Sequence, residues 1–315
     1  MSFHPGEPAN RALRALILTA ADNAAVRAIV DRYGMRLGAS RFVAGEVLDE
    51  CIPVLSGLNE SGLKTNTTLL GEGVLDSDRA GGATRAYEAI VERLAAEELD
   101  VYVALKLTHL GLPLAEETAY ENLERVVAAA ARVGMFVRID MEESRWVDAT
   151  LRIYRRLRVA GFDNVGVVLQ SYLYRSADDL EALLPLQPNL RIVKGAYLEP
   201  PELAMRDKHD VDESYRRLVE RSLRAGGYTA VATHDTAIIK STIGFAKREG
   251  IDAPGKFEFQ MLYGVCENLQ ESLVERGYPV LVATPFGPEW YPYLMRRLAE
   301  RPANVLFFLR ALLPS

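Results

Sequence analysis

The sequence contains few of the residues that mark secreted, metal-binding or nucleic-acid-binding proteins. Its 315 residues include only two cysteines, Cys51 and Cys266, which argues against a disulfide framework and favours a reducing compartment. The formal net charge is −6, without the basic excess typical of nucleic-acid binders, so no nucleic-acid partner is expected. The four histidines are dispersed and neither HExxH nor CxxC occurs, so no metal site is predicted.

Long apolar runs are also scarce. The N-terminal stretch MSFHPGEPANRALRALILTAAD contains Glu, Asn and Asp, so it predicts neither a signal peptide nor a membrane-spanning helix. The C-terminal stretch NVLFFLRALL (304–313) is apolar enough for an interfacial helix, but packing against the rest of the protein is the favoured use. We therefore predict a cytoplasmic protein without a transmembrane segment.

From about residue 65 the chain alternates short β-branched runs with longer amphipathic segments, which is typical of βα units around a parallel sheet. The predicted strands are 67–72, 101–107, 136–141, 165–170, 190–195, 229–234, 256–261 and 279–284. The clearest predicted helices are 83–99, 120–134, 146–161 and 213–227.

Eight strands are the number that closes a (βα)8 barrel, and the chain has the length that this fold requires. A doubly wound open sheet is the alternative, but no GxGxxG follows the first strand. Residues 22–35 and 42–58 read as further helices that precede the barrel. We predict an α/β protein with an N-terminal helical segment (1–62) and a (βα)8 catalytic barrel (63–315).

Polar or ionisable side chains stand near the ends of seven of these eight strands. They are Glu72, Lys106 with Thr108, Asp140 with Glu142, Gln170 with Tyr172, Lys194 with Tyr197, Thr233 with His234, and Gln260 with Tyr263. Each alone is as easily a loop residue that bonds its own backbone, but their agreement predicts an active site at the barrel mouth, where such enzymes carry their chemistry.

The residue types at this mouth suit a small anionic substrate and a phosphate-bearing cofactor, because Lys and Arg are prominent and GxSxG is absent. One interpretation is a class I aldolase or lyase in which Lys106 or Lys194 forms a Schiff base. The other is a cofactor-dependent enzyme whose cations hold phosphates and a carboxylate. The residues themselves leave both interpretations open.

The stretch YPYLMRRLAE (291–300) places Arg296 and Arg297 side by side in a predicted helix. Taken alone, the pair is typical of a solvated charged face on which Glu300 pairs back to both arginines. Adjacent helical side chains point about 100° apart, so over a barrel mouth two guanidinium groups would approach different sides of one carboxylate.

Seven segments, in this order, resemble those of the flavin-dependent proline dehydrogenases, both the monofunctional bacterial enzymes and the corresponding domain of bifunctional proline-utilisation proteins. The segments are ALKLTHLG, RIDMEE, LQSY, LRIVKGAY, VATHD, FEFQMLYG and YPYLMRRLAE. The resemblance runs from about residue 65 to the C-terminus. It implies a distorted (βα)8 (TIM-like) barrel with its last helix over the mouth and a noncovalently bound FAD.

The resemblance also implies the reaction and its partners. L-proline would be oxidised to 1-pyrroline-5-carboxylate by hydride transfer from C5 to FAD, and the electrons would pass to a quinone. A quinone acceptor implies a peripheral contact with the inner face of the cell membrane.

By the same resemblance, Lys106, Arg296 and Arg297 hold the proline carboxylate, and Asp140 orients the arginine and substrate network. The residues that wall the proline ring are Tyr197, Leu262 and Tyr293. Glu72 forms a gating ion pair with Arg296 over the bound substrate.

The positions that match the family's flavin contacts come mainly from the ends of the fourth to sixth predicted strands. They are Gln170, Arg191, Lys194, Gly195, Ala196, Thr233 and His234. Arg191 is expected near the flavin N5. Glu300 matches the acidic position that follows the arginine pair and is expected to steady that pair beside the cofactor.

Two positions depart from the family pattern. The sequence ATPFG places Ala283 where the family's eighth strand commonly carries Tyr, which predicts looser discrimination against hydroxyproline. The KGAYW pattern of some members becomes KGAYL, with Leu198, which affects only the expected packing beside the flavin.

Overall fold

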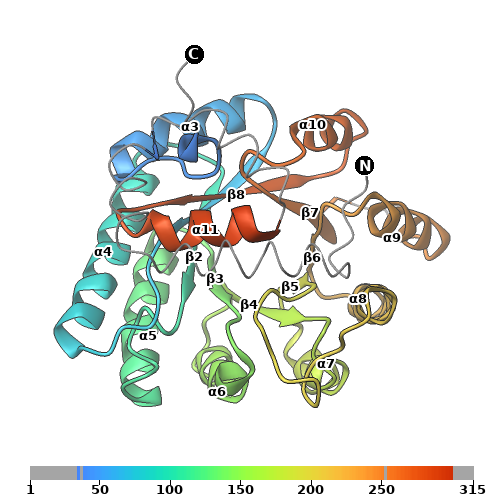
Figure 1. The fold of residues 1–315 in the computed structure, drawn as a ribbon, viewed down its shortest axis with the longest axis horizontal. Coiled ribbons are helices and arrows are strands. Elements are labelled where there is room, and N and C mark those ends of the chain that lie inside the picture. Colours follow the sequence, from blue (N-terminus) through green and yellow to red (C-terminus); the bar gives the residue numbers. More distant parts are fainter. Residues whose placement is uncertain (1–33, 36–37, 252–253, 301–315) are drawn as a thin grey trace.

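The computed structural model describes residues 34–35, 38–251 and 254–300, except for the side chains of Ala299 and Glu300. Eight parallel strands close into a barrel in sequence order (Figure 1). The strands are β1 (Lys64–Leu69), β2 (Val101–Lys106), β3 (Val137–Asp140), β4 (Val165–Gln170), β5 (Leu190–Val193), β6 (Thr229–Ala232), β7 (Phe257–Leu262) and β8 (Val280–Phe286). The predicted (βα)8 fold is therefore confirmed.

The first strand was expected at 67–72, which is wrong by three residues at each end. β1 begins at Lys64 because it pairs along its whole length with β8, from Lys64 opposite Leu281 to Leu69 opposite Phe286. Its sequence KTNTTL has little apolar character, so the strand is set by this pairing and not by its composition. Glu72 consequently lies in the loop after β1.

Amphipathic helices cover the outside of the barrel. They are α3 (Leu48–Glu60), α4 (Ser77–Ala95), α5 (Glu116–Arg132), α6 (Ser144–Val159), α7 (Ser176–Leu183), α8 (Lys208–Arg224), α9 (Thr236–Arg248) and α10 (Glu267–Glu275). Short 3-10 helices occur at η1 (Ala39–Arg41) and η2 (Leu184–Leu186). Side-chain caps start several helices: Asp207 accepts a hydrogen bond from the His209 amide at 2.7 Å at the start of α8.

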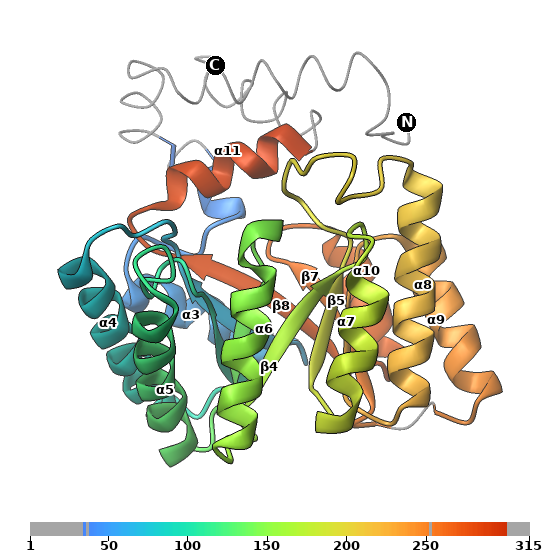
Figure 2. The ribbon, with the colours of Figure 1, turned by 90° about the horizontal axis from the view of Figure 1, so that it is seen from below.

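The last helix, α11 (Trp290–Glu300), lies across the barrel mouth instead of beside β8 (Figure 2). The outer position next to β8 and β1 is taken by α3, whose Cys51 and Leu55 are fully buried against the barrel. A helix from the N-terminal side thus fills the place that a regular barrel gives to the helix after β8. This exchange leaves α11 available to form the roof of the site.

The helix expected at 42–58 begins only at Leu48. The chain before it is irregular, and Phe42 and Val43 are buried with Leu294 and Leu298 in a small apolar cluster beneath α11. The apolar residues before Leu48 therefore serve this cluster and not a helix face. The helix expected at 22–35 and the stretch 304–313 lie essentially outside the described residues. Within the described part of the chain, no helix is both long and apolar enough to cross a bilayer.

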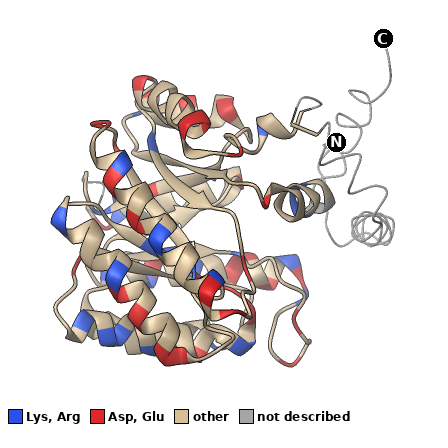
Figure 3. Ribbon diagram, turned by 90° about the vertical axis from the view of Figure 1, so that its left-hand side faces the viewer, with Lys and Arg blue, Asp and Glu red and all other residues tan. Residues whose placement is uncertain are grey.

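Basic and acidic residues are interspersed along the helices in the view of Figure 3. Ion pairs link neighbouring helices of the barrel: Arg125 to Glu88 at 2.8 Å between α5 and α4, and Arg152 to Glu116 at 2.7 Å between α6 and α5. This face therefore presents no surface of a single charge sign.

Candidate active site

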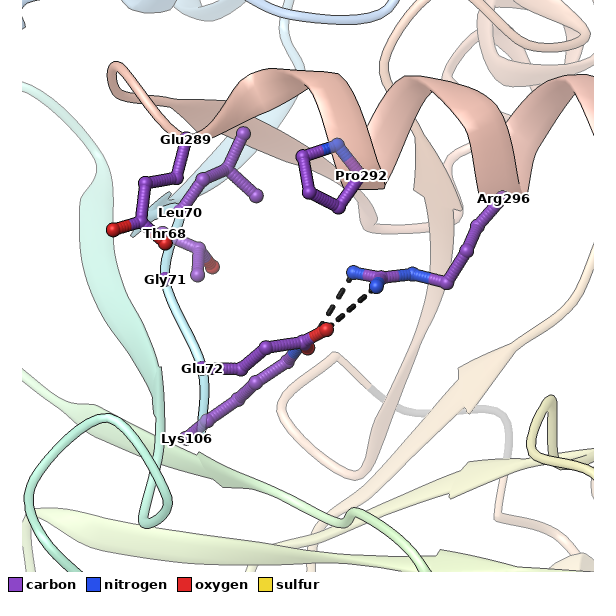
Figure 4. Close-up of a pocket in the computed structure, with 8 residues that line it drawn as sticks. All are labelled: Thr68, Leu70, Gly71, Glu72, Lys106, Glu289, Pro292 and Arg296. Atoms are coloured by element: carbon purple, nitrogen blue, oxygen red, sulfur yellow. Dashed lines mark hydrogen bonds and ion pairs between the residues drawn. The ribbon is translucent and has the colours of Figure 1, made fainter. Parts of the chain in front are cut away.

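A half-buried carboxylate, Glu72, joins two cations at the barrel mouth (Figure 4). Arg296, which descends from α11, donates from Nη1 to Glu72 Oε1 at 2.6 Å, and Lys106 at the end of β2 donates from Nζ to Oε2. The three residues line a pocket with Leu70 and Pro292. The site thus brings together two predicted carboxylate-binding residues from opposite ends of the chain.

The electrostatics of this trio keep the Glu72 carboxyl ionised. Burial on its own raises the pKa of Glu72, but the charges and hydrogen bonds of Lys106 and Arg296 outweigh burial and bring it below its usual value of 4.5. The space between the Lys106 ammonium and the Arg296 guanidinium is therefore suited to a carboxylate, which here is that of Glu72.

A second group lies inside the barrel, below the mouth. The guanidinium of Arg191 donates from Nη1 to Asp140 Oδ1 at 2.6 Å and from Nε to Gln260 Oε1 at 2.5 Å. Gln260 in turn donates to the Tyr102 hydroxyl at 2.9 Å. Burial alone lowers the pKa of Arg191, but Tyr102 and Asp140 raise it, so this buried group stays charged. Asp140 therefore fixes Arg191 in orientation. Its expected role in orienting the arginine and substrate network stays a prediction.

A third group surrounds Lys194 after β5. Its ammonium lies 2.5 Å from Asp212 Oδ1 and 3.1 Å from Asp235 Oδ2, and Lys208 contacts the same two carboxylates. Asp235 also caps α9, and although burial opposes it, the bonds from Lys194 and from this cap lower the pKa of Asp235 to about 2. Both candidate Schiff-base lysines, Lys106 and Lys194, are thus ion-paired with carboxylates, an arrangement that does not suit a nucleophilic amine.

The predicted ring-wall residues lie around the mouth. Leu262 and Tyr293 pack against the apolar cluster beneath α11, and the Arg297 guanidinium lies 5.3 Å from the centre of the Tyr293 ring. Burial foremost, with carboxylates nearby, raises the pKa of Tyr197 far above its usual value, so its phenol stays protonated. Ala283 stands opposite Leu262 in the β7–β8 register.

The positions expected to contact a flavin cluster at the ends of β4 to β6. Gln170 is buried and donates to the Glu142 carbonyl at 2.9 Å, and Thr233 accepts from the Asp235 amide at 3.1 Å. The ring nitrogen of His234 accepts from the Leu262 amide at 3.0 Å.

The segment that follows β5 comes close to an aromatic ring. Gly195 has a φ of +113° and lies against the Tyr172 ring, so no side chain fits at that position. Ala196 follows it and is exposed, as is Leu198, whose exposed fraction is 78%. Glu300 ends α11, but its side chain lies outside the described residues.

Several residues of these groups were not anticipated. Tyr102 precedes Lys106 by four residues on β2, so both point into the barrel, and a strict period of two would have identified it. Asp212 lies on α8, far along the chain from Lys194, and no local pattern indicates the pair. Among the described residues, no group of His, Cys, Asp and Glu is arranged to hold a metal ion.

Comparisons with known proteins agree on one family. Its sequence model, described as Proline dehydrogenase, matches residues 51–310. Proline dehydrogenase 1 of Bacillus subtilis subsp. natto is 40% identical over 301 residues, covering 96% of this chain and 99% of the relative. The proline dehydrogenase of Deinococcus radiodurans is 41% identical over 304 residues, covering 95% and 97%. Proline utilization A of Bdellovibrio bacteriovorus shares the fold, with a TM-score of 0.80 and 24% identity over 94% of this chain and 37% of that one.

The Asp140–Arg191 pair should contribute to stability, because it compensates a buried cation. We expect Asp140→Asn to lower the free energy of unfolding by roughly 1–3 kcal/mol, since the buried guanidinium loses its counter-charge. Asp148→Asn is the matched control, because Asp148 pairs with Arg175 at 2.5 Å on the surface. That variant should lose less than about 1 kcal/mol. Urea unfolding followed by circular dichroism measures both, and equal losses would contradict this assignment.

Proposed function

Because the chain belongs to the proline dehydrogenase family, we propose that the pocket beneath α11 binds the proline that the enzyme oxidises to 1-pyrroline-5-carboxylate. The observation that carries this proposal is the Glu72 carboxylate held between Lys106 and Arg296. The proline carboxylate takes over the contact with Lys106, while Arg296 binds it from the α11 side together with Arg297. Glu72 stays paired with Arg296 and closes over the bound substrate.

The remaining mouth residues would orient the ring of the substrate. Tyr197, Leu262 and Tyr293 supply two aromatic rings and one aliphatic side chain around the pocket, a set that suits an apolar five-membered ring. Holding the carboxylate by fixed cations and the ring by these walls restricts the substrate to one orientation. The positive charges nearby also favour the neutral form of the substrate amine, whose proton must leave during oxidation.

The family is flavin-dependent, and the donor set at the ends of β4 to β6 fits FAD. Arg191 and Lys194 are cations, Gln170 and Thr233 are neutral hydrogen-bonding groups, and Gly195 and Ala196 leave backbone accessible. When bound, FAD supplies the acceptor for the hydride that leaves C5 of proline. Arg191, fixed by Asp140, would provide a positive charge beside the flavin ring, and His234 and Glu300 complete the proposed contacts.

A lyase or aldolase mechanism has no support from the site. It requires an unprotonated lysine, and both candidates are ion-paired with carboxylates. The family assignment favours oxidation.

Replacing Arg296 tests the carboxylate clamp. Arg296→Met should raise the KM for proline by roughly 100-fold or more, because a charge-assisted bidentate contact is lost, while flavin remains bound. Arg79→Met is the matched control, since Arg79 pairs with Glu289 near the same mouth but is 65% exposed. Steady-state kinetics of both variants measure the KM for proline, and their flavin absorbance shows whether the cofactor remains bound. An unchanged KM for Arg296→Met would remove the clamp from the proposed function.

Ala283 tests the specificity of the ring pocket. With a methyl group opposite Leu262, we expect kcat/KM for hydroxyproline to fall less than roughly 100-fold below that for proline. Ala283→Tyr should widen the difference by filling the space. Strong rejection of hydroxyproline by the unmodified enzyme would contradict the role given to Ala283.

We further propose that a quinone accepts the electrons at a membrane surface. Protein reduced by proline without oxygen should be reoxidised rapidly by vesicles that contain a quinone, and slowly by the same vesicles without it. The protein should also sediment with these vesicles. If the vesicles neither reoxidise the protein nor sediment with it, the proposal of a quinone acceptor at a membrane is wrong.

A further inference from the structure

A chain of buried hydrogen bonds connects the ends of the first four strands. The Thr108 hydroxyl donates to Glu142 Oε2 at 2.5 Å, and the Thr108 amide donates to Glu142 Oε1 at 3.1 Å. The same hydroxyl accepts from the Gly73 amide at 3.1 Å. On the other side, Gln170 donates to the Glu142 carbonyl at 2.9 Å. The chain therefore runs from the loop after β1, through β2 and β3, to β4.

Each link of this chain stands one or two residues from a group of the proposed site. Gly73 follows Glu72, Thr108 follows Lys106 by two residues, and Glu142 follows Asp140 by two residues. Lys106 and Asp140 are themselves paired in the β2–β3 register. A shift at any link would move the side chain that binds substrate or holds Arg191.

The loop that carries Glu72 is held mainly through Thr108. The carbonyl of Thr108 accepts a hydrogen bond from the Val74 amide at 2.9 Å, and the hydroxyl of Thr108 accepts one from the Gly73 amide. On the other flank Gly71 lies against the buried ring of His109. Glu72 is thus fixed on both sides by residues of the loop that follows Lys106, the last residue of β2.

Glu142 determines the orientation of the Thr108 hydroxyl. It is only 4% exposed, and Thr108 is its donor at both carboxylate oxygens. A hydroxyl has one proton, so donation to Glu142 leaves only the oxygen lone pairs of Thr108 for the Gly73 amide. Without the carboxylate, the hydroxyl is free to rotate and the contact with Gly73 loses its orientation.

We propose that Thr108 and Glu142 are positioning residues that set the reach of Glu72 toward Arg296 and Lys106, and thereby the affinity for the substrate carboxylate. This inference rests on the proposed function. Neither residue touches the substrate, so both act on KM through Glu72 and leave the oxidation step largely unchanged.

The test compares Thr108→Val, which removes the hydroxyl at constant shape, with Thr108→Ser, which keeps it. Thr108→Val should raise the KM for proline roughly three- to tenfold, as expected for the loss of one hydrogen bond of ordinary net strength, with kcat changed less than about twofold. Thr108→Ser should restore a KM close to that of the unmodified enzyme. Glu142→Gln should resemble Thr108→Val, whereas Glu143→Gln, whose side chain pairs with Arg145 on the surface, should have no effect.

A double-variant cycle separates positioning from a general structural role. In a Glu72→Gln background, Thr108→Val should change KM little further, because the group on which it acts is already gone. An equal increase in both backgrounds, or an unchanged KM for Thr108→Val, overturns the inference. Should Thr108→Val fail to fold, Glu142→Gln carries the same comparison. If Arg296→Met raises KM and these variants do not, this inference fails while the proposed function stands.

Discussion

Charges that are withdrawn from water must be paired, and this constraint governs the arrangement of the whole site. The Arg191 guanidinium lies inside a closed barrel, so it requires Asp140, and the pair in turn orders Gln260 and Tyr102. Lys194 is likewise held by Asp212 and Asp235. The mouth therefore consists of cations with fixed orientations, which is what binding a small anion and a phosphate-bearing cofactor requires.

The barrel supplies these pairs because parallel strands deliver their carboxyl ends to one rim. Lys106, Asp140 and Gln170 come from consecutive strands and share that rim through the sheet register alone. Arg296 cannot reach it in this way. It arrives from α11, which is free to lie over the mouth because α3 occupies the outer position beside β8 and β1.

Much of this was predictable from the sequence. The alternation of β-branched runs and amphipathic segments identified eight strands, and their ends placed Lys106, Asp140 and Lys194 at the mouth. The position of β1 was missed because a polar strand is determined by its neighbours in space. The pairing of Lys194 with Asp212 was missed for a similar reason, because the two residues meet only in the folded barrel and no local pattern links them. Tyr102 was missed although its inward position follows from the strand period of two, and only its contact with Arg191 depends on the closed barrel.

The Glu72 carboxylate has a consequence for the energetics of recognition. It pairs with both Lys106 and Arg296, so the two cations are held close together despite their mutual repulsion. In the proposed function they need not be gathered when the substrate carboxylate arrives. The three charges leave an excess of one positive charge, which a single incoming carboxylate neutralises. In the proposed function the mouth is thus preorganised by an internal carboxylate, and substrate binding is an exchange of partners at little reorganisation cost.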